Sequence, residues 1–249
     1  MSEQPERNFS ARIAYDGTSY AGFQIQPTEP TIQGELEKAL GKVLGSEIRI
    51  HAASRTDAGV HAIGQVSSFR AASPLPAGEI ERAVNALLPP EIRVGPVFER
   101  HDDFHARYSN KGKRYSYYLY RGERESPFLA RYSLWVKRDL NEGLMRDAAS
   151  LLIGVRDFRS FSSRVNEKEN AEKEMSLIDL REYDEILEIV LQASGFLYQM
   201  ARCIVGALLE IGQERLTAAD IARWVDNPVL GACRHIAPAK GLCLMEVYY

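Results

Sequence analysis

Ser54-Arg55-Thr56-Asp57-Ala58-Gly59-Val60-His61 is the stretch around which the sequence is organised, and Gln65-Val66-Ser67-Ser68-Phe69 follows it. The pattern indicates the end of a strand, a tight polar loop and a new strand. Asp57 and Gly59 are residue types that favour turns, and a turn alone would account for them. Alternatively, the loop presents the carboxylate of Asp57 and the guanidinium of Arg55 together as functional groups. Catalytic groups are often carried on loops held by a rigid scaffold.

Hydrophobic periodicity predicts six elements in the first part of the chain. They are, in order, a strand over 8–15, a helix over 31–44, strands over 48–53 and 65–70, a helix over 76–88 and a strand over 92–98. In the second helix, Ile80, Val84 and Leu87 are expected to face inward. The order β-α-β-β-α-β is that of the ferredoxin-like unit.

The second part of the chain predicts a similar series. It comprises a tyrosine-rich strand over 113–120, a helix over 141–152, strands over 175–183 and 186–193, a long helix over 196–211, a further helix over 217–225 and a strand over 242–248. Residues 162–174 are highly charged and are predicted to form a mobile loop. In the long helix, Leu197, Met200, Ile204 and Leu208 have the spacing of a core stripe.

The predicted fold class is therefore α+β, with two ferredoxin-like units joined into one mostly antiparallel sheet with helices on one face. The first unit is expected over residues 1–105 and carries the loop of Asp57, and the second is expected over 106–249. A concave face between two such units is a favoured place for a pocket.

Composition limits the class of protein. With 249 residues, of which 45% are hydrophobic and 26% charged, the chain has enough apolar mass for a core. It contains no apolar run of the roughly 20 residues that a membrane-spanning helix needs. The polar N-terminus lacks a signal peptide, and three unpaired cysteines suit a reducing compartment, so we expect a cytoplasmic protein.

Charge distribution is more informative than the net charge of −3. Basic residues crowd one segment, which is compatible with phosphate contacts: Arg107, Lys111, Lys113, Arg114, Arg121 and Arg124. Within it, basic and aromatic residues alternate on the predicted strand around Tyr115. This alternation fits either a solvated sheet edge or a face on which unpaired bases stack.

Other chemistries find little support in the sequence. His101 and His105 have i, i+4 spacing but no convincing third ligand, and Cys233, His235 and Cys243 are too irregular for a structural zinc site. There is no G-x-S-x-G nucleophile elbow and no phosphate-binding P-loop. Arg202, in contrast, is a guanidinium in an apolar stretch, which is costly unless it has a partner.

Ala53-Ser54-Arg55-Thr56-Asp57-Ala58-Gly59-Val60-His61-Ala62 closely resembles the signature of the tRNA pseudouridine synthase A family. Stretches 15–26, 195–202 and 237–244 resemble further motifs of this family, and the likeness extends from Ala11 to Tyr249. The resemblance implies a uridine-to-pseudouridine isomerase acting on the tRNA anticodon stem-loop, at positions 38–40, without a cofactor or metal.

The resemblance also implies roles for individual residues. Asp57 is expected to be the nucleophile or base, and Arg202 is expected to pair with it and keep it charged. Arg55 would take the place of the flipped base, Tyr115 of the Lys-x-Tyr pattern would stack on the target uracil, and Leu244 would pack against it. Further contacts to the RNA are expected from Gln24, Arg107, Lys111, Lys113 and Arg114.

Family members form homodimers, and the resemblance implies a homodimer here. One departure is Arg156, where the family commonly has His; it bears on the RNA target more than on the reaction. Two alternatives stay open: a related synthase acting on another RNA, such as ribosomal RNA, or a catalytically silent RNA-binding protein. The aromatic K/R-G-F/Y box of RRM domains is missing, which argues against the silent binder.

Overall fold

In the computed structural model, which describes residues 5–166 and 170–249, strand β1 lies between β3 and β4 and pairs antiparallel with both. The described chain divides into two units: residues up to Lys111 together with Leu244–Tyr249, and Gly112–Cys243. The elements of the first unit are β1 (Arg7–Tyr15), α1 (Ile32–Leu44), β2 (Ile50–Ala52), β3 (His61–Ala71), α2 (Ala77–Asn85) and β4 (Ile92–Arg100).

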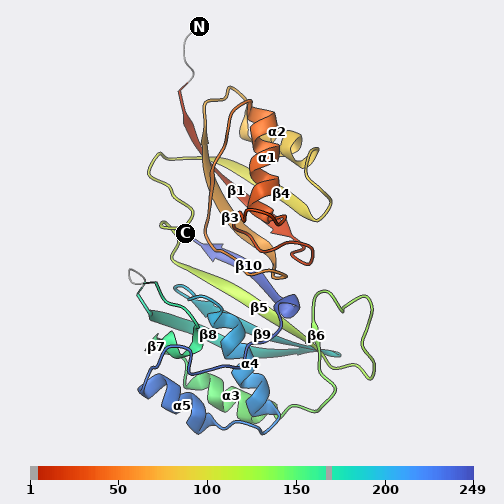
Figure 1. Cartoon of the computed structure of the whole chain (residues 1–249), viewed down its shortest axis with the longest axis vertical. Helices are drawn as coiled ribbons and strands as arrows, with labels where there is room; N and C mark the ends of the chain where they lie inside the picture. The colour runs from red at the N-terminus through yellow and green to blue at the C-terminus, as the bar shows by residue number, and fades with distance from the viewer. Residues whose placement is uncertain (1–4, 167–169) are drawn as a thin grey trace. The chain divides into compact units, whose positions relative to one another are not determined.

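Alternation along β1 builds the core of the first unit. Phe9, Ala11, Ile13 and Tyr15 are all buried, as the period of two predicts. Helices α1 and α2 supply the opposing apolar surface through residues such as Leu36 (Figure 1). Thr31 caps α1 by accepting a hydrogen bond from the backbone N–H of Gly34 at 3.2 Å. The β-α-β-β-α-β order expected for this unit is confirmed.

The far edge of β3 has two partners within the first unit. β2 pairs with Ser67–Phe69, and the C-terminal strand β10 (Leu242–Tyr248) follows β3 in the strand order β4-β1-β3-β10. The approach of β10 is close, since a Cβ on Gly64 would lie 2.0 Å from the carbonyl oxygen of Met245. This unit is therefore completed by the last residues of the chain.

The second unit is a sheet with strand order β5-β9-β8-β7 and three α-helices among its described residues (Figure 1). Helix α3 contacts α4, α5 and strand β8. Its elements are β5 (Gly112–Tyr120), β6 (Leu134–Trp135), α3 (Glu142–Ser150), β7 (Gly154–Asp157), the 3-10 turn η1 (Arg159–Phe161), β8 (Glu172–Tyr183), β9 (Ile186–Ala193), α4 (Met200–Gly212), α5 (Ala218–Asp226) and the 3-10 turn η2 (Ala239–Gly241).

Pairing is antiparallel for β1 with β3 and β4, β2 with β3, β5 with β9, β7 with β8 and β8 with β9, whereas β5 and β6 are parallel. This confirms the α+β class and the mostly antiparallel pairing. Buried aromatic rings dominate the second core, including Tyr117, Phe158 and Phe161. All three cysteines are buried thiols outside any disulfide, and Cys233 donates a long hydrogen bond to the carbonyl of Cys203 at 3.6 Å. Burial raises the pKa of the Cys233 thiol to about 11.

Several predicted boundaries need correction. The long helix begins at Met200 rather than 196, because Gln199 adopts a left-handed backbone with φ 58°. Helix α2 ends at Asn85, so Leu87 lies beyond it and is 49% exposed instead of facing inward. Strand β8 begins at Glu172, within the predicted 162–174 loop. Residues 167–169 of that loop lie outside the described residues, and the mobility predicted for 162–174 stays a prediction.

Two short strands were not expected from the sequence. β6 has only two residues, and β7 has four with the burial pattern intermediate, exposed, exposed, intermediate. Neither offers the alternation on which strand prediction depends. No helix among the described residues combines the length and apolar character needed to cross a membrane.

Candidate active site

The loop of Asp57 connects β2 to β3 in the first unit. Its turn is closed by the backbone N–H of Val60, which donates to the carbonyl of Asp57 at 3.1 Å. Gly59 occupies this turn with φ 78°, a conformation that favours glycine. The motif thus forms a tight turn, and both interpretations of the sequence, as a turn and as a carrier of functional groups, remain compatible with its backbone.

Side chains along the loop point in different directions. Thr56 is buried, and its hydroxyl lies 2.7 Å from that of Tyr15. Its neighbours differ, because Arg55 is exposed and Asp57 is half-buried. Thr56 therefore anchors the loop from the inside, between an exposed arginine and a half-buried aspartate.

Gln65 fixes the entrance to the loop. Its side-chain carbonyl accepts from the backbone N–H of Ser54 at 3.2 Å, and its amide nitrogen donates to the Ser54 carbonyl at 2.8 Å. Gln65 is fully buried, so these bonds form away from water and hold both backbone groups of Ser54. Sequence reasoning placed Gln65 in a strand and did not identify this role.

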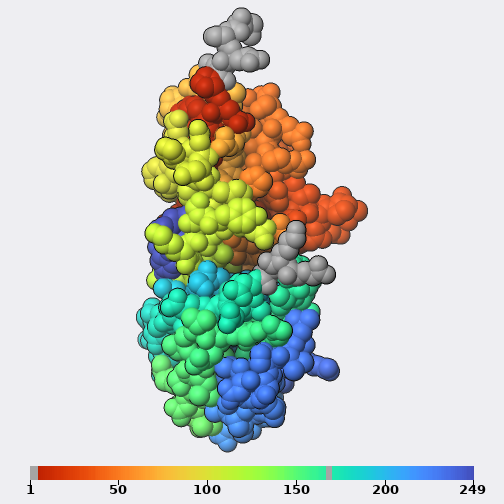
Figure 2. Space-filling model, turned by 90° about the vertical axis from the view of Figure 1, so that its left-hand side faces the viewer, coloured from red at the N-terminus to blue at the C-terminus, as the bar shows by residue number. Residues whose placement is uncertain are grey.

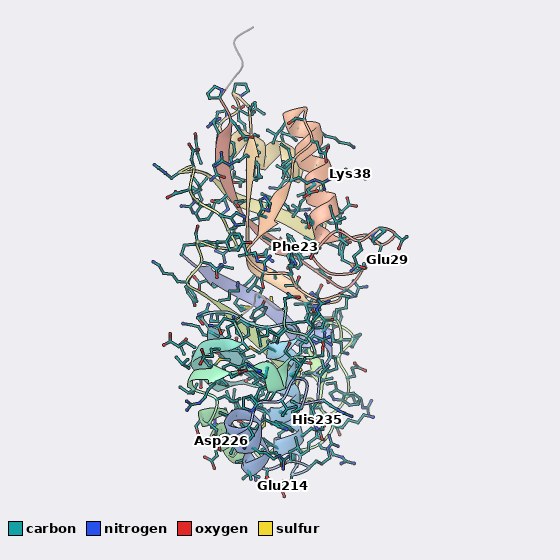
Figure 3. All side chains as sticks on the ribbon, turned by 60° about the vertical axis from the view of Figure 1, so that its left-hand side comes forward. Phe23, Glu29, Lys38, Glu214, Asp226 and His235 are labelled. Atoms are coloured by element: carbon teal, nitrogen blue, oxygen red, sulfur yellow. The ribbon has the colours of Figure 1, made fainter. Side chains whose placement is uncertain are left out.

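The glycine-rich segment after β1 packs directly against the Asp57 loop. A Cβ on Gly17 would lie 2.0 Å from the carbonyl oxygen of Val60, and one on Gly22 would lie 2.8 Å from that of Thr56. The backbone N–H of Phe23 also donates to the Thr56 carbonyl at 3.1 Å. Phe23, labelled in Figure 3, is buried, whereas its neighbour Gln24 is exposed. Only glycine permits this close approach of two backbones.

His61 adds a second link between the two segments. The backbone N–H of Gly17 donates to its Nδ1 at 3.1 Å, and this nitrogen also lies 3.2 Å from a carboxylate oxygen of Asp16. The same carboxylate oxygen accepts from the backbone N–H of Thr18 at 2.9 Å. His61, Gly17 and Asp16 therefore join the Asp57 loop to the segment that follows β1.

In the second unit, Tyr115 lies on β5 opposite Leu191 of β9. It is 5% exposed, and its ring meets that of Phe196 in a T-shaped arrangement with centroids 5.0 Å apart. Lys113 and Arg114, which precede it, are half-buried. The strand therefore places the ring in the interior and its two cations at the margin.

Arg202 lies in the first turn of α4 and is half-buried. Its Nε donates to the carbonyl of Ala237 at 2.8 Å, and the backbone N–H of Ala237 donates back to the Arg202 carbonyl at 3.0 Å. The approach of this segment to α4 depends on Gly206, because a Cβ there would lie 2.2 Å from the carbonyl oxygen of His235. These contacts fix the direction of the guanidinium.

The segment that follows Ala237 is anchored to β5. Tyr117 donates to the carbonyl of Pro238 at 2.8 Å, and a Cβ on Gly241 would lie 2.6 Å from its ring. Burial raises the pKa of the Tyr117 hydroxyl well above its usual range, an effect that the positive charge of Arg202 opposes. The motif predicted at 237–244 is thus built onto the two elements that carry Arg202 and Tyr115.

The structure places the predicted site residues on a few elements. The first unit holds Arg55 and Asp57 on one loop, with Gln24 on the segment that packs against it. It also holds Arg107 and Lys111, both exposed, and Leu244, which is fully buried in β10. The second unit holds Lys113, Arg114, Tyr115 and Arg202. Their functional roles stay predictions.

Metal-ligating side chains do not cluster among the described residues. Within residues 5–166 and 170–249, no group of three or more His, Cys, Asp or Glu side chains is placed to hold a metal ion. The arrangement that the described residues do offer is a half-buried carboxylate on a rigid loop, with cations and aromatic rings on other elements. Such groups suit nucleophilic or acid-base chemistry.

Comparison with known sequences gives consistent results. The profile of the family described as tRNA pseudouridine synthase matches residues 11–109 and 148–249. The chain is 37% identical over 243 residues to tRNA pseudouridine synthase A 2 of Bacillus cereus, covering 97% of this chain and 99% of that protein. It is 41% identical over 238 residues to tRNA pseudouridine synthase A of Geobacillus kaustophilus, covering 95% and 92%. The corresponding protein of Geobacter sulfurreducens is 38% identical over 243 residues, covering 98% and 100%.

Proposed function

The chain belongs to the tRNA pseudouridine synthase family, and from this membership we propose that it isomerises uridine to pseudouridine in the anticodon stem-loop of tRNA, with Asp57 as the nucleophile. The resemblance recognised in the sequence motifs is confirmed by the family match. The observation that carries the proposal for Asp57 is its loop, which is held by Tyr15, Gln65 and the glycine-rich segment and leaves Asp57 half-buried.

The proposed reaction rearranges bonds without consuming a reagent. The bond from C1′ of the ribose to N1 of uracil breaks, the base turns, and a bond forms from C1′ to C5. The proton on C5 is lost and a proton is gained at N1, so atoms and electrons balance. Asp57 begins this sequence by attacking either the ribose or the uracil ring, and both routes are compatible with a carboxylate nucleophile.

A rigid loop supports this role for a physical reason. Positioning a nucleophile in advance converts a bimolecular encounter into an effectively unimolecular step and removes much of its entropic cost. The Asp57 loop has few degrees of freedom, because one side-chain amide holds both backbone groups of Ser54 and a backbone carbonyl of Val60 is close to Gly17.

Other residues receive supporting roles in the proposal. Arg202 pairs with Asp57 and keeps it ionised, and its Nε is already engaged with the Ala237 carbonyl, which favours one guanidinium direction. Arg55 fills the space left by the flipped uridine, whose unstacking costs a few kcal/mol. Tyr115 stacks on the uracil and Leu244 packs against it. The RNA backbone is contacted by Gln24, Arg107, Lys111, Lys113 and Arg114.

The proposal extends to partners and location. A homodimer that binds one tRNA across both subunits, in the cytoplasm, is the expected state. A different RNA, such as ribosomal RNA, is the first alternative, and Arg156 is the residue that motivates it. Mapping pseudouridines in the RNAs of a deletion strain separates the two: loss confined to ribosomal RNA would favour the alternative.

The central test is an assay of purified protein with unmodified tRNA carrying tritium at C5 of its uridines. Release of tritium reports loss of the C5 proton, and carbodiimide-directed primer extension locates the product. Wild type is expected to release tritium from the anticodon stem-loop, and Asp57→Asn and Asp57→Ala are expected to release none while binding tRNA with nearly unchanged Kd.

The matched control is Asp184→Asn, which alters an exposed carboxylate at the turn between β8 and β9. It is expected to behave as wild type. Turnover by Asp57→Ala would exclude the proposed nucleophile. Tight tRNA binding by wild type with no tritium release would instead favour the catalytically silent RNA-binding protein.

A further inference from the structure

The segment from His101 to Asn110 is held firmly onto the first unit by hydrogen bonds from side chains. The backbone N–H of Ala106 donates to Ser68 Oγ at 3.1 Å, and its carbonyl accepts from the hydroxyl of Tyr249 at 2.9 Å. Asn110 Nδ2 donates to the carbonyl of Arg107 at 2.6 Å. Ala106 is fully buried. The conformation of this segment is therefore fixed before any partner binds.

An aromatic ring also anchors the inner side of the segment. Phe104 packs on Tyr249, with ring centroids 5.0 Å apart, and the guanidinium of Arg100 lies over Phe104 at 5.0 Å. Arg100 is itself held by donating from Nε to Ser10 Oγ at 2.7 Å. These contacts hold the segment in place without any contribution from its outward-facing rings.

Three rings lie in a row on the outer side, each tilted against the next. His105 lies between His51 and Tyr108, with centroid distances of 4.8 Å and 4.5 Å and interplanar angles of 32° and 39°. Tyr108 ends the row and is 75% exposed. The guanidinium of Arg107 lies over the Tyr108 ring, 5.6 Å from its centroid. In Figure 2 the yellow-green atoms of this part of the chain are at the surface facing the viewer.

His105 is fixed in this row in its neutral form. Its Nδ1 accepts from the backbone N–H of Arg107 at 3.1 Å, so the proton is on Nε2. Burial lowers the pKa of its imidazole, and the neighbouring His51 lowers it further. The hydrogen bond from Arg107 thus orients the imidazole that lies against the ring of Tyr108.

We infer that His51, His105, Tyr108 and Arg107 form a stacking platform for an unpaired nucleobase of the RNA substrate, separate from the uridine that reacts. This inference rests on the proposed function and adds a second point of contact with the RNA. Tyr108, at the exposed end of the row, offers aromatic surface to a base. Arg107, whose guanidinium lies over that ring, and Lys111, four residues further on, offer cations for the flanking phosphates. Aromatic and basic side chains in this combination are the usual means of binding single-stranded nucleic acid.

The location of the platform also favours RNA. His51 lies in β2, the strand that leads into the Asp57 loop, and it pairs with Ser68, the residue whose hydroxyl holds Ala106. One strand therefore connects the platform to the loop. A base held at the platform would limit how the substrate lies relative to that loop, without taking part in the chemistry.

The test compares tRNA binding by Tyr108→Ala, Tyr108→Phe and wild type, with the full chain, across a series of salt concentrations. Tyr108→Ala is expected to raise Kd by about fivefold or more, which corresponds to the lower end of measured stacking contributions. Tyr108→Phe keeps the ring and is expected to stay within about twofold of wild type.

Salt dependence separates stacking from phosphate contact. Arg107→Gln is expected to reduce the slope of log Kd against log salt by about one, whereas Tyr108→Ala is expected to leave the slope unchanged. The matched control is Tyr183→Ala, which removes an exposed tyrosine at the end of β8 and is expected to leave Kd and the slope unaltered. Circular dichroism confirms that each variant is folded.

The outcomes distinguish this inference from the proposed function. If wild type releases tritium from tRNA and Tyr108→Ala binds as wild type does, the platform is wrong and the proposed function stands. If Tyr108→Ala and Tyr183→Ala weaken binding equally, the effect is not specific and the platform is also wrong. Wild type that neither binds nor modifies tRNA would overturn both.

Discussion

The hydroxyl oxygen of Tyr15 lies 2.7 Å from the hydroxyl oxygen of Thr56, and both side chains are buried. Tyr15 ends β1, and Thr56 immediately precedes Asp57, so this bond ties the central strand of the first unit to the loop that carries the proposed nucleophile. The amide nitrogen of Gln65 lies 3.4 Å from the same Tyr15 oxygen, which makes the hydroxyl a shared anchor.

Removing that hydroxyl is expected to weaken the loop. Tyr15→Phe leaves the Thr56 hydroxyl buried without this partner, which costs about 1–3 kcal/mol of unfolding free energy. The rate of pseudouridine formation is expected to fall more than tRNA affinity, because Asp57 loses its positioning. Urea denaturation and the tritium assay measure the two effects. Tyr183→Phe, which removes the hydroxyl of an exposed tyrosine, serves as control. Equal stability of Tyr15→Phe and wild type would contradict the anchoring role of the Tyr15 hydroxyl.

The close approach of two backbones at Gly17 gives a second prediction. In Gly17→Ala the new Cβ would meet the Val60 carbonyl carbon and oxygen at 2.8 and 2.0 Å, and a backbone cannot move aside without displacing the Asp57 loop. Overpacking of this kind costs about 1–3 kcal/mol or more. Activity is expected to fall sharply in the tritium assay.

Gly78 supplies the matched control for that substitution. It lies in α2, and a Cβ there would meet nothing within 4 Å. Gly78→Ala is expected to stabilise the protein by roughly 0.5–1 kcal/mol, because alanine loses less conformational freedom in a helix. If Gly17→Ala were as stable as Gly78→Ala, the interlocking of the two segments would be wrong.

Tyr115 is expected to act through its ring. Tyr115→Phe keeps the edge contact with Phe196 and should retain both stability and tRNA affinity. Tyr115→Ala removes a buried ring, which costs roughly 3–5 kcal/mol of stability, and also removes its proposed stacking on uracil. Phe196→Ala loses the same edge contact but leaves Tyr115 in place. An affinity lowered equally in Tyr115→Ala and Phe196→Ala would make Tyr115 a purely structural residue.

Gln199 gives a prediction about the start of α4. Its φ of 58° and ψ of 5° are left-handed, a conformation that costs about 1–3 kcal/mol for residues other than glycine. Gln199→Gly is expected to keep stability and activity, whereas Gln199→Val, with a β-branched side chain, is expected to lose roughly 1–2 kcal/mol. Because Arg202 lies one turn further on, the valine variant is also expected to lose activity in the tritium assay. Equal stability of the two variants would contradict this account.

Sequence patterns predicted the first unit well because its elements bury one clear face. The alternation of apolar residues from Phe9 to Tyr15 predicted strand β1, whose buried face confirms it. The β-α-β-β-α-β order of the unit followed from similar patterns. The same reasoning missed β7, where Val155 is 59% exposed and no face is buried. It also misplaced the start of α4, because apolar periodicity continues through Leu197 while the backbone reverses at Gln199.

The site was predicted only in part for a similar reason. The Arg55–Asp57 loop was identified from a contiguous motif, but the bonds that hold it come from residues distant in sequence. Gln65 reaches back eleven positions to Ser54, and Tyr15 is 41 positions from Thr56. Both anchors lie in strands, where a polar residue on the buried face was the available signal.

The first unit combines the beginning of the chain with Leu244–Tyr249, whereas the second is one uninterrupted segment. During synthesis the second unit can therefore be finished while β3 still lacks its β10 neighbour. The half that carries Asp57 is thus completed by residues synthesised after all of the second unit, and the proposed nucleophile gains its final support later than the groups on that unit.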